Sequence, residues 1–127
     1  MTPRPHSLAE VARRTAAGES FEFELADFLH EFQLRGDVAM LLDEPVLLQE
    51  ALPSRVLEDA YLAAVAVSLA STARLPVPAW TLDTRRVLRE PWFASTGRHM
   101  RALLLVESPA AFRERNLFVT ANALSVA

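Results

Sequence analysis

The sequence predicts an all-α fold: a compact single-domain helical bundle of about six or seven helices over residues 1–127. Three observations support this prediction. Residues 20–36 carry apolar side chains at the spacing of one helix face, and residues 60–73 form an uncharged, alanine-rich stretch typical of a buried core helix. Strand patterns are nearly absent, and only residues 117–119 are candidates for a single strand or a short extended C-terminal tail.

The composition is that of a globular intracellular protein. With 127 residues, of which 51% are hydrophobic and 23% charged, the chain is long enough for one domain with its own core. The absence of cysteine excludes disulfides and thiolate-bound zinc or iron–sulfur clusters. The polar start, Met1–His6, does not resemble a secretory signal, and the stretch 60–73 is shorter than a membrane span of about 20 residues. We therefore expect a cytoplasmic protein without a membrane segment.

Two helices are predicted in the first 36 residues. Ser7, with Glu10 three residues later, forms a capping box at the start of the first helix, and Gly18 is a suitable stop. Ser20 is the candidate cap of the second helix, which Gly36 ends. The apolar residues of this second helix share one face and are expected to point into the core: Phe21, Leu25, Phe28, Leu29 and Phe32.

The middle of the chain predicts a short helix followed by the longest one. Asp37 caps the short helix, Pro45 ends it, and residues 46–51 add one or two further turns. The long helix covers roughly residues 55–73 and carries alanine on most of its faces. Because small side chains let neighbouring helices approach closely, we expect this helix at the centre of the bundle.

Prolines divide the rest of the chain into short elements. Residues 75–78 cannot be helical throughout, because each proline pushes the preceding residue into an extended conformation. One short helix is expected within residues 81–88, capped at Asp83, and Pro91 follows as a breaker.

The last helices are predicted from two further cap signals. Ser95 or Thr96 caps a helix whose apolar residues are Met100, Leu103, Leu104 and Val106. Ser108–Pro109 is typical of an N-cap followed by proline at the first helical position, so a last short helix is expected over 110–115.

No catalytic motif is present, and no residue is predicted to be catalytic, cofactor-binding or metal-binding. The three glycines are isolated, which excludes a glycine-rich phosphate loop. The acidic pairs Asp43–Glu44 and Glu58–Asp59 join adjacent residues, which point about 100° apart on a helix and do not converge. The histidines are isolated and are interpreted as surface or helix-end residues: His6, His30 and His99. A non-enzymatic protein without a cofactor is expected, and an enzyme with a site built from dispersed residues is the lowest-ranked alternative.

The charges are unevenly distributed between the two halves. Residues 1–60 hold twelve acidic residues and five arginines, a net charge of −7, whereas residues 61–127 hold four acidic residues and eight arginines, a net charge of +4. All basic residues are arginine. The asymmetry indicates either a partner surface or two halves that face each other within the fold, and the pattern does not separate the two.

A nucleic-acid-binding function is an alternative that depends on the second half. Residues 8–32 superficially resemble helix-turn-helix, but the second helix is acidic and phosphates would repel it. An arginine surface in the second half remains the alternative, with these residues: Arg85, Arg86, Arg89, Arg98, Arg101, Arg113 and Arg115.

Two clusters of aromatic and arginine residues, 76–93 and 108–118, have the composition of binding hot spots. Their aromatic rings are interpreted first as core residues, since large aromatics are usually buried. We expect one of Arg113 and Arg115 to fold back against the protein and the other to be exposed. The candidate interaction surface consists of Trp80, Arg85, Arg86, Arg89, Trp92, Arg98, Arg101, Arg113, Arg115 and Asn116.

The same clusters resemble a group of short, poorly characterised bacterial proteins. The similarity lies in Pro-x-Pro-Ala-Trp at 76–80, Pro-Trp-Phe at 91–93, and Ser-Pro-x-x-Phe-Arg-x-Arg-Asn-x-Phe at 108–118, and it extends to residues 7–12 and 27–29. The resemblance implies an antitoxin-like partner of a toxin-type enzyme such as a nucleotidyltransferase, and it carries no catalytic residues. The expected function is therefore binding of a protein partner, with homo-oligomerisation left open.

Overall fold

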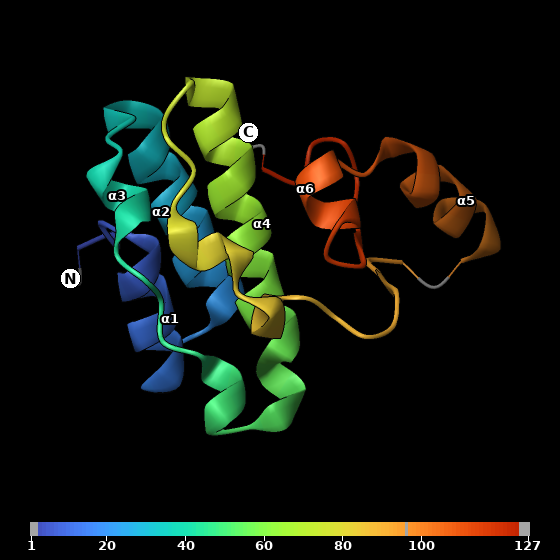
Figure 1. Cartoon of the computed structure of the whole chain (residues 1–127), viewed down its shortest axis with the longest axis horizontal. Helices are drawn as coiled ribbons and strands as arrows, with labels where there is room; N and C mark the ends of the chain where they lie inside the picture. The colour runs from blue at the N-terminus through green and yellow to red at the C-terminus, as the bar shows by residue number, and fades with distance from the viewer. Residues whose placement is uncertain (1–2, 96, 125–127) are drawn as a thin grey trace.

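The computed structural model describes residues 3–95 and 97–124, which form a mostly helical domain (Figure 1). The α-helices are α1 (Leu8–Ala16), α2 (Phe21–Arg35), α3 (Ala39–Leu42), α4 (Val56–Ala73), α5 (Arg98–Glu107) and α6 (Ala110–Arg113). Four 3-10 turns connect them: η1 (Leu48–Glu50), η2 (Pro53–Arg55), η3 (Ala79–Leu82) and η4 (Thr84–Arg86). Two strands are present, β1 (Trp92–Phe93) and β2 (Leu117–Phe118). The predicted helical fold is confirmed.

Side chains cap the first two helices as the sequence predicts. The Ser7 hydroxyl accepts a hydrogen bond from the amide of Glu10 at 3.0 Å, and Ser20 does the same for Phe23 at 3.4 Å. The Glu10 carboxylate reaches the amide of His6 rather than that of Ser7, so the capping box is shifted by one residue. Both caps use donors that the first turn of a helix leaves without a partner.

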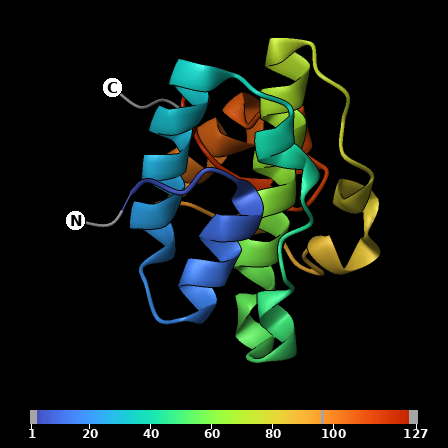
Figure 2. The ribbon, with the colours of Figure 1, turned by 90° about the vertical axis from the view of Figure 1, so that its left-hand side faces the viewer.

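Helices α1 and α2 pack against each other, α3 contacts α1, and α4 runs beside them with buried side chains in between (Figures 1 and 2). Five side chains show the layering: Leu8, Phe28, Leu41, Leu62 and Val65 are fully buried between these helices. Alanines fill much of the buried surface of α4, which allows the close approach expected of the central helix.

One helical run, formed by η2 and α4, meets the length and composition criterion for a membrane-spanning helix. The helical run Pro53–Ala73 passes that criterion by length and composition, which corrects the shorter estimate made from residues 60–73. The central position of α4 accounts for its apolar character, because residues such as Leu62, Ala63 and Val65 lie in the core of the bundle.

The C-terminal lobe, residues 87–120, lies beside the bundle, with α5 at its far end (Figure 1). Its two strands pair in parallel, with Trp92 opposite Leu117 and Phe93 opposite Phe118. The predicted extended segment is therefore a strand, and its partner at residues 92–93 was not predicted. Helix α6 joins the lobe to the bundle through Phe112, whose ring meets that of Tyr61 edge-on at 5.1 Å.

One further local prediction was confirmed and one was wrong. The short helix expected within residues 81–88 is the 3-10 turn η4, and the Asp83 carboxylate caps it by accepting the amide of Arg85, although a second 3-10 turn, η3, precedes it. Ser108 does not cap α6; its buried hydroxyl instead donates to Leu104 at the end of α5 and accepts the amide of Val119. Of the two predicted caps of α5, Thr96 lies outside the described residues, and Gly97 occupies the N-cap position.

Candidate protein-binding surface

Trp80 and Arg86, two of the candidate surface residues, lie in the interior. The Trp80 indole donates a hydrogen bond to the Leu41 carbonyl at 2.9 Å, and the Arg86 guanidinium lies 4.8 Å from the centre of the Trp80 ring. Arg86 is fully buried and donates to the carbonyl oxygens of Asp59, at 3.3 Å, and Pro45. Burial lowers the pKa of Arg86, and the neighbouring Asp59 charge opposes that change. Neither residue can belong to an exposed surface.

Arg115 is also buried, whereas Arg113 is exposed, so the predicted division between the two is confirmed. The Arg115 guanidinium donates to the carbonyl oxygens of Ala111 at 2.8 Å and Thr81 at 3.0 Å. Its nearest carboxylate oxygen belongs to the exposed Glu114, 3.9 Å away. Carbonyl groups rather than a buried carboxylate therefore hold Arg115 in place.

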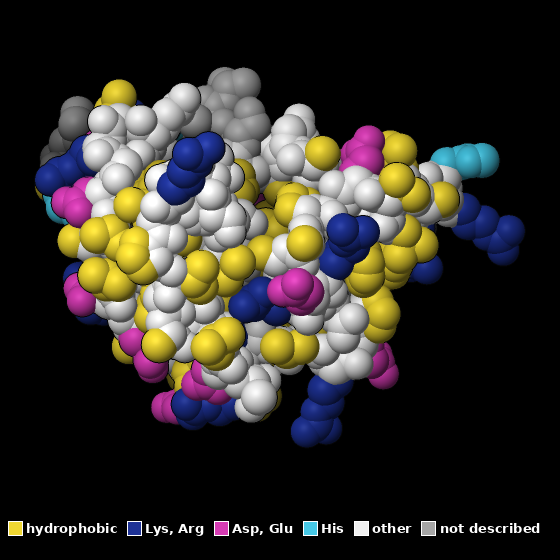
Figure 3. All heavy atoms as spheres, turned by 45° about the horizontal axis from the view of Figure 1, so that its top comes forward, with side chains coloured by type: hydrophobic (Ala, Val, Ile, Leu, Met, Phe, Trp, Pro, Cys, Tyr) yellow, Lys and Arg dark blue, Asp and Glu magenta, His cyan; other side chains and the backbone are white. Residues whose placement is uncertain are grey.

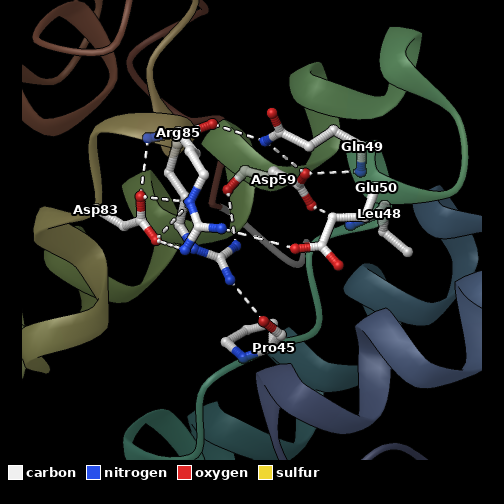
Figure 4. Close-up of polar contacts among 8 residues, drawn as sticks. Pro45, Leu48, Gln49, Glu50, Asp59, Asp83 and Arg85 are labelled. Atoms are coloured by element: carbon white, nitrogen blue, oxygen red, sulfur yellow. Dashed lines mark hydrogen bonds and ion pairs between the residues drawn. The ribbon is translucent and has the colours of Figure 1, made fainter.

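Asp59, at the start of α4, is the fully buried carboxylate on which this polar region is centred (Figure 4). It accepts the backbone amides of Leu48 at 2.8 Å and Gln49 at 2.9 Å, and the Gln49 side-chain amide at 2.9 Å. The same amide donates to the Arg85 carbonyl at 2.7 Å. A charge buried in this way is stable because its oxygens are hydrogen-bonded, so the arrangement fixes the η1 and η4 turns against α4.

Arg85 is exposed, but its guanidinium is already paired with acidic side chains. Its guanidinium contacts Asp83 at 2.7 Å and Glu50 at 3.6 Å (Figure 4). The hydrogen bonds from Arg85 lower the pKa of Asp83 to about 2. This pair neutralises much of the positive charge that the sequence places at residues 85–86.

The remaining candidate residues stay at the surface without forming one cluster. Arg101 lies over the Phe93 ring at 5.2 Å, and the half-buried Asn116 donates its side-chain amide to the Leu88 carbonyl at 2.7 Å. Trp92 is 36% exposed and lines the groove described next. Among the candidate residues, the exposed arginines without a role in the polar region of Asp59 are Arg89, Arg98, Arg101 and Arg113.

An open groove of about 860 Å³ runs between α2 and the first half of α4. Its floor is apolar and is built by Phe21, Leu25, Leu29, Leu57 and Tyr61. The Phe21 and Tyr61 rings meet edge-on at 6.1 Å, and neither side chain is fully buried. We name this feature the α2/α4 groove.

The rim of the α2/α4 groove is acidic. Glu19 and Glu22 are exposed there, Glu58 is partly buried, and Arg55 lies 3.6 Å from Glu58; His30 also lines the groove. Burial raises the pKa of Glu58; the charge of Arg55 lowers it and that of Asp59 raises it. Burial also raises the pKa of Tyr61, and the Glu22 carboxylate adds to this effect. Both shifts therefore come mainly from burial, which disfavours the charged form of either side chain in the groove, and the charges of Asp59 and Glu22 make smaller contributions.

A second hollow of about 430 Å³ continues along the same two helices. It shares Leu29 with the α2/α4 groove and is lined further by Phe32, Leu69 and Leu124. The boundary between α2 and α4 is therefore hollowed along much of its length, and the C-terminal residues Ala123 and Leu124 lie at its edge.

Helical periodicity predicted Phe21 as a core residue, and it did not reveal the groove. Phe21 packs edge-on against Tyr61 and remains only partly buried. The acidic residues at the start of α2 were a usable signal, since Glu22 forms part of the rim. They were explained instead by the favourable interaction of acids with a helix N-terminus.

In the part of the chain that the structure describes, no group of three or more His, Asp or Glu residues could hold a metal ion. No family model, curated protein or solved structure matches the chain.

Proposed function

We propose that this chain is a non-enzymatic, intracellular protein-binding domain whose α2/α4 groove accepts an apolar segment of a protein partner. The observation that carries the proposal is the combination of an apolar floor with an acidic rim in an open groove between two helices. An antitoxin that neutralises a toxin-type enzyme is the specific form of this function that the sequence resemblance favours.

The shape of the groove favours a helical segment as the ligand. Grooves between two packed helices accept a third amphipathic helix, which places apolar side chains on the floor. Phe21, Leu57 and Tyr61 are only partly buried, so they retain apolar surface to contribute to such an interface. Aromatic residues in a partly enclosed position are typical of binding hot spots.

The charge of the rim specifies the partner segment further. Glu19, Glu22 and Glu58 would face arginine or lysine residues that flank the apolar side chains of the ligand. Complementary charges of this kind accelerate association and select among partners more than they increase affinity. We therefore propose a ligand helix with basic residues on both sides of an apolar stripe.

The test is co-purification with the product of the neighbouring gene, using two matched charge reversals on α2. Glu22→Arg changes the rim of the groove, whereas Asp27→Arg makes the same change at an exposed position outside it. We expect Glu22→Arg to weaken co-purification and Asp27→Arg to leave it unchanged. Equal retention of the partner by both variants would show that the groove is not the binding site.

The alternative function, binding of nucleic acid as an accessory protein, is favoured by one observation. Arg89, Arg98, Arg101 and Arg113 are exposed in the C-terminal lobe. Phosphate contacts release counterions, so such binding would weaken steeply with salt. Gel shifts at low salt that are lost on Arg113→Ala combined with Arg89→Ala would place this alternative first, against the net charge of −3.

A further inference from the structure

Helix α5 exposes more apolar surface than any other helix of the C-terminal lobe. Of its large apolar residues only Leu104 is buried, while Met100 is 40% exposed, Leu103 45%, Leu105 49% and Val106 77%. Figure 3 shows hydrophobic side chains gathered with arginines over the lobe that carries α5. A soluble domain rarely leaves such a group of side chains uncovered unless they bind something.

Three of these residues form a stripe on one side of α5. A helix turns about 100° per residue, so Met100, Leu103 and Val106, each three positions apart, follow one face. His99 and Glu107 flank the stripe at its two ends, and both are exposed. Leu103 lies at its middle. We name these five residues the α5 stripe.

The α5 stripe is complementary to itself when its direction is reversed. His99 and Glu107 are each four positions from Leu103, on opposite sides, and Met100 and Val106 are each three positions from it. A two-fold axis through Leu103 would therefore place a hydrogen-bond donor opposite a carboxylate at both ends. In such an isologous contact, each residue meets the same partner twice.

We propose that the α5 stripe binds the α5 stripe of a second copy of this chain, with the two helices antiparallel. Leu103 lies on the two-fold axis, Met100 packs against Val106 of the partner subunit, and His99 donates a hydrogen bond to the partner's Glu107. The antiparallel arrangement also places the positive end of each helix dipole beside the negative end of the other. This interface is separate from the α2/α4 groove and does not depend on the function proposed for it.

The size of the contact determines how the dimer will behave. One pair of ten-residue helices belongs to the small class of interfaces, below about 1,200 Å² in total. We therefore expect a dimer that forms and dissociates with concentration. Sedimentation velocity over a range of concentrations is the appropriate measurement.

The first experiment uses the absence of cysteine from the chain. A thiol introduced by Leu103→Cys would meet its own copy at the two-fold axis, whereas one introduced by Leu105→Cys lies roughly 200° round the helix. Both positions are about equally exposed, so the variants are matched. Under mild oxidation of dilute protein, we expect a disulfide-linked dimer from Leu103→Cys and little from Leu105→Cys. Equal cross-linking of the two variants would overturn the proposal.

The second experiment tests the same interface, including the contact between His99 and Glu107, without relying on cross-linking. Leu103→Asp places two carboxylates together and should raise the dimer dissociation constant roughly tenfold or more, while Leu105→Asp should not. His99→Glu and Glu107→Lys should each weaken the dimer, and the double variant should restore it, because the charges are then exchanged. A monomeric parent at every concentration, or a double variant no better than the single ones, would contradict the antiparallel arrangement.

Discussion

The bundle of α1 to α4 and the region from η3 to β2 are held together by different means. In the bundle, the buried side chains are almost all apolar, with Thr15 and Asp59 as the polar members. In residues 79–120, buried polar residues are more frequent and include two arginines, Arg86 and Arg115. The first region is a conventional apolar core, whereas in the second region guanidinium groups bind backbone carbonyls.

The difference follows from the kind of secondary structure in each region. Long helices such as α2 and α4 satisfy most of their carbonyls internally, whereas short turns and connecting segments leave more carbonyls without a backbone donor. A guanidinium offers five donors in a fixed plane and can satisfy several carbonyls together. Arg86 links Pro45 to Asp59, so it also joins the arginine-rich half of the chain to the acidic half. The ion pair between Arg85 and Glu50, at 3.6 Å, also joins the two halves, so part of the uneven charge distribution is used in contacts within the fold.

The largest effect on stability is expected in the bundle, from removing the buried ring of Phe28. Phe28 is fully buried and stacks with Phe32 at 6.0 Å. Phe28→Ala should lower the free energy of unfolding by about 3–5 kcal/mol, because it removes apolar contacts and leaves a cavity. Chemical denaturation measures this loss. Phe23 is 76% exposed on the same helix, so Phe23→Ala is the control and should remain within about 0.5 kcal/mol of the parent.

The second prediction tests whether buried guanidinium groups contribute to the stability of the second region, as apolar side chains do in the first. Arg86→Ala should lower the free energy of unfolding by about 2–4 kcal/mol, since it leaves the Pro45 carbonyl without its donor and empties space beside Trp80. Arg89→Ala, at an exposed position nearby, should have almost no effect. Denaturation curves that coincide for Arg86→Ala and the parent would show that burial of this arginine contributes nothing to stability.

Sequence patterns predicted the bundle well because its signals are local. The caps at Ser7 and Ser20, the stop at Gly36 and the long helix α4 each depend on residues within one or two turns. Gly36 ends α2 with a φ of 56°, a left-handed conformation that glycine adopts without strain.

The C-terminal lobe was predicted less well because its structure depends on contacts between distant residues. Ser108 has the local pattern of a helix cap, yet its hydroxyl pairs with Val119, eleven residues away. Trp92 forms a strand only because Leu117 lies beside it. Among the candidate surface residues, burial of Arg86 and Arg115 depends in the same way on carbonyls that come from elsewhere in the chain.

A smaller effect distinguishes Arg113, the last residue of α6, from Arg115, which lies two residues beyond it. Arg115→Ala should lower the free energy of unfolding by about 1–3 kcal/mol, because the carbonyls of Ala111 and Thr81 lose a charged donor but no buried carboxylate is left unpaired. Arg113→Ala should melt like the parent, since Arg113 is exposed. Separate melting curves provide the measurement. Equal melting temperatures for both variants would mean that carbonyl binding by Arg115 is not stabilising.

The smallest effect concerns the exposed contact between Asp83 and Arg85, which lies within the second region. Arg85 lowers the pKa of Asp83 from 3.8 to about 2, so the folded chain holds this carboxylate charged more readily than the unfolded chain does. The stability that results is complete above the unfolded pKa and is lost as the pH falls from about 4 toward 2. Salt should reduce it, because the pair is at the surface. Nuclear magnetic resonance titration of the carboxyl carbon should therefore give a pKa near 2 in the parent and a higher value in Arg85→Ala. If Asp83 titrates near 3.8 in both proteins, the hydrogen bonds that join it to Arg85 do not persist in solution, and η4 is held to the bundle by Arg86 and by the Gln49 side chain, which binds the Arg85 carbonyl.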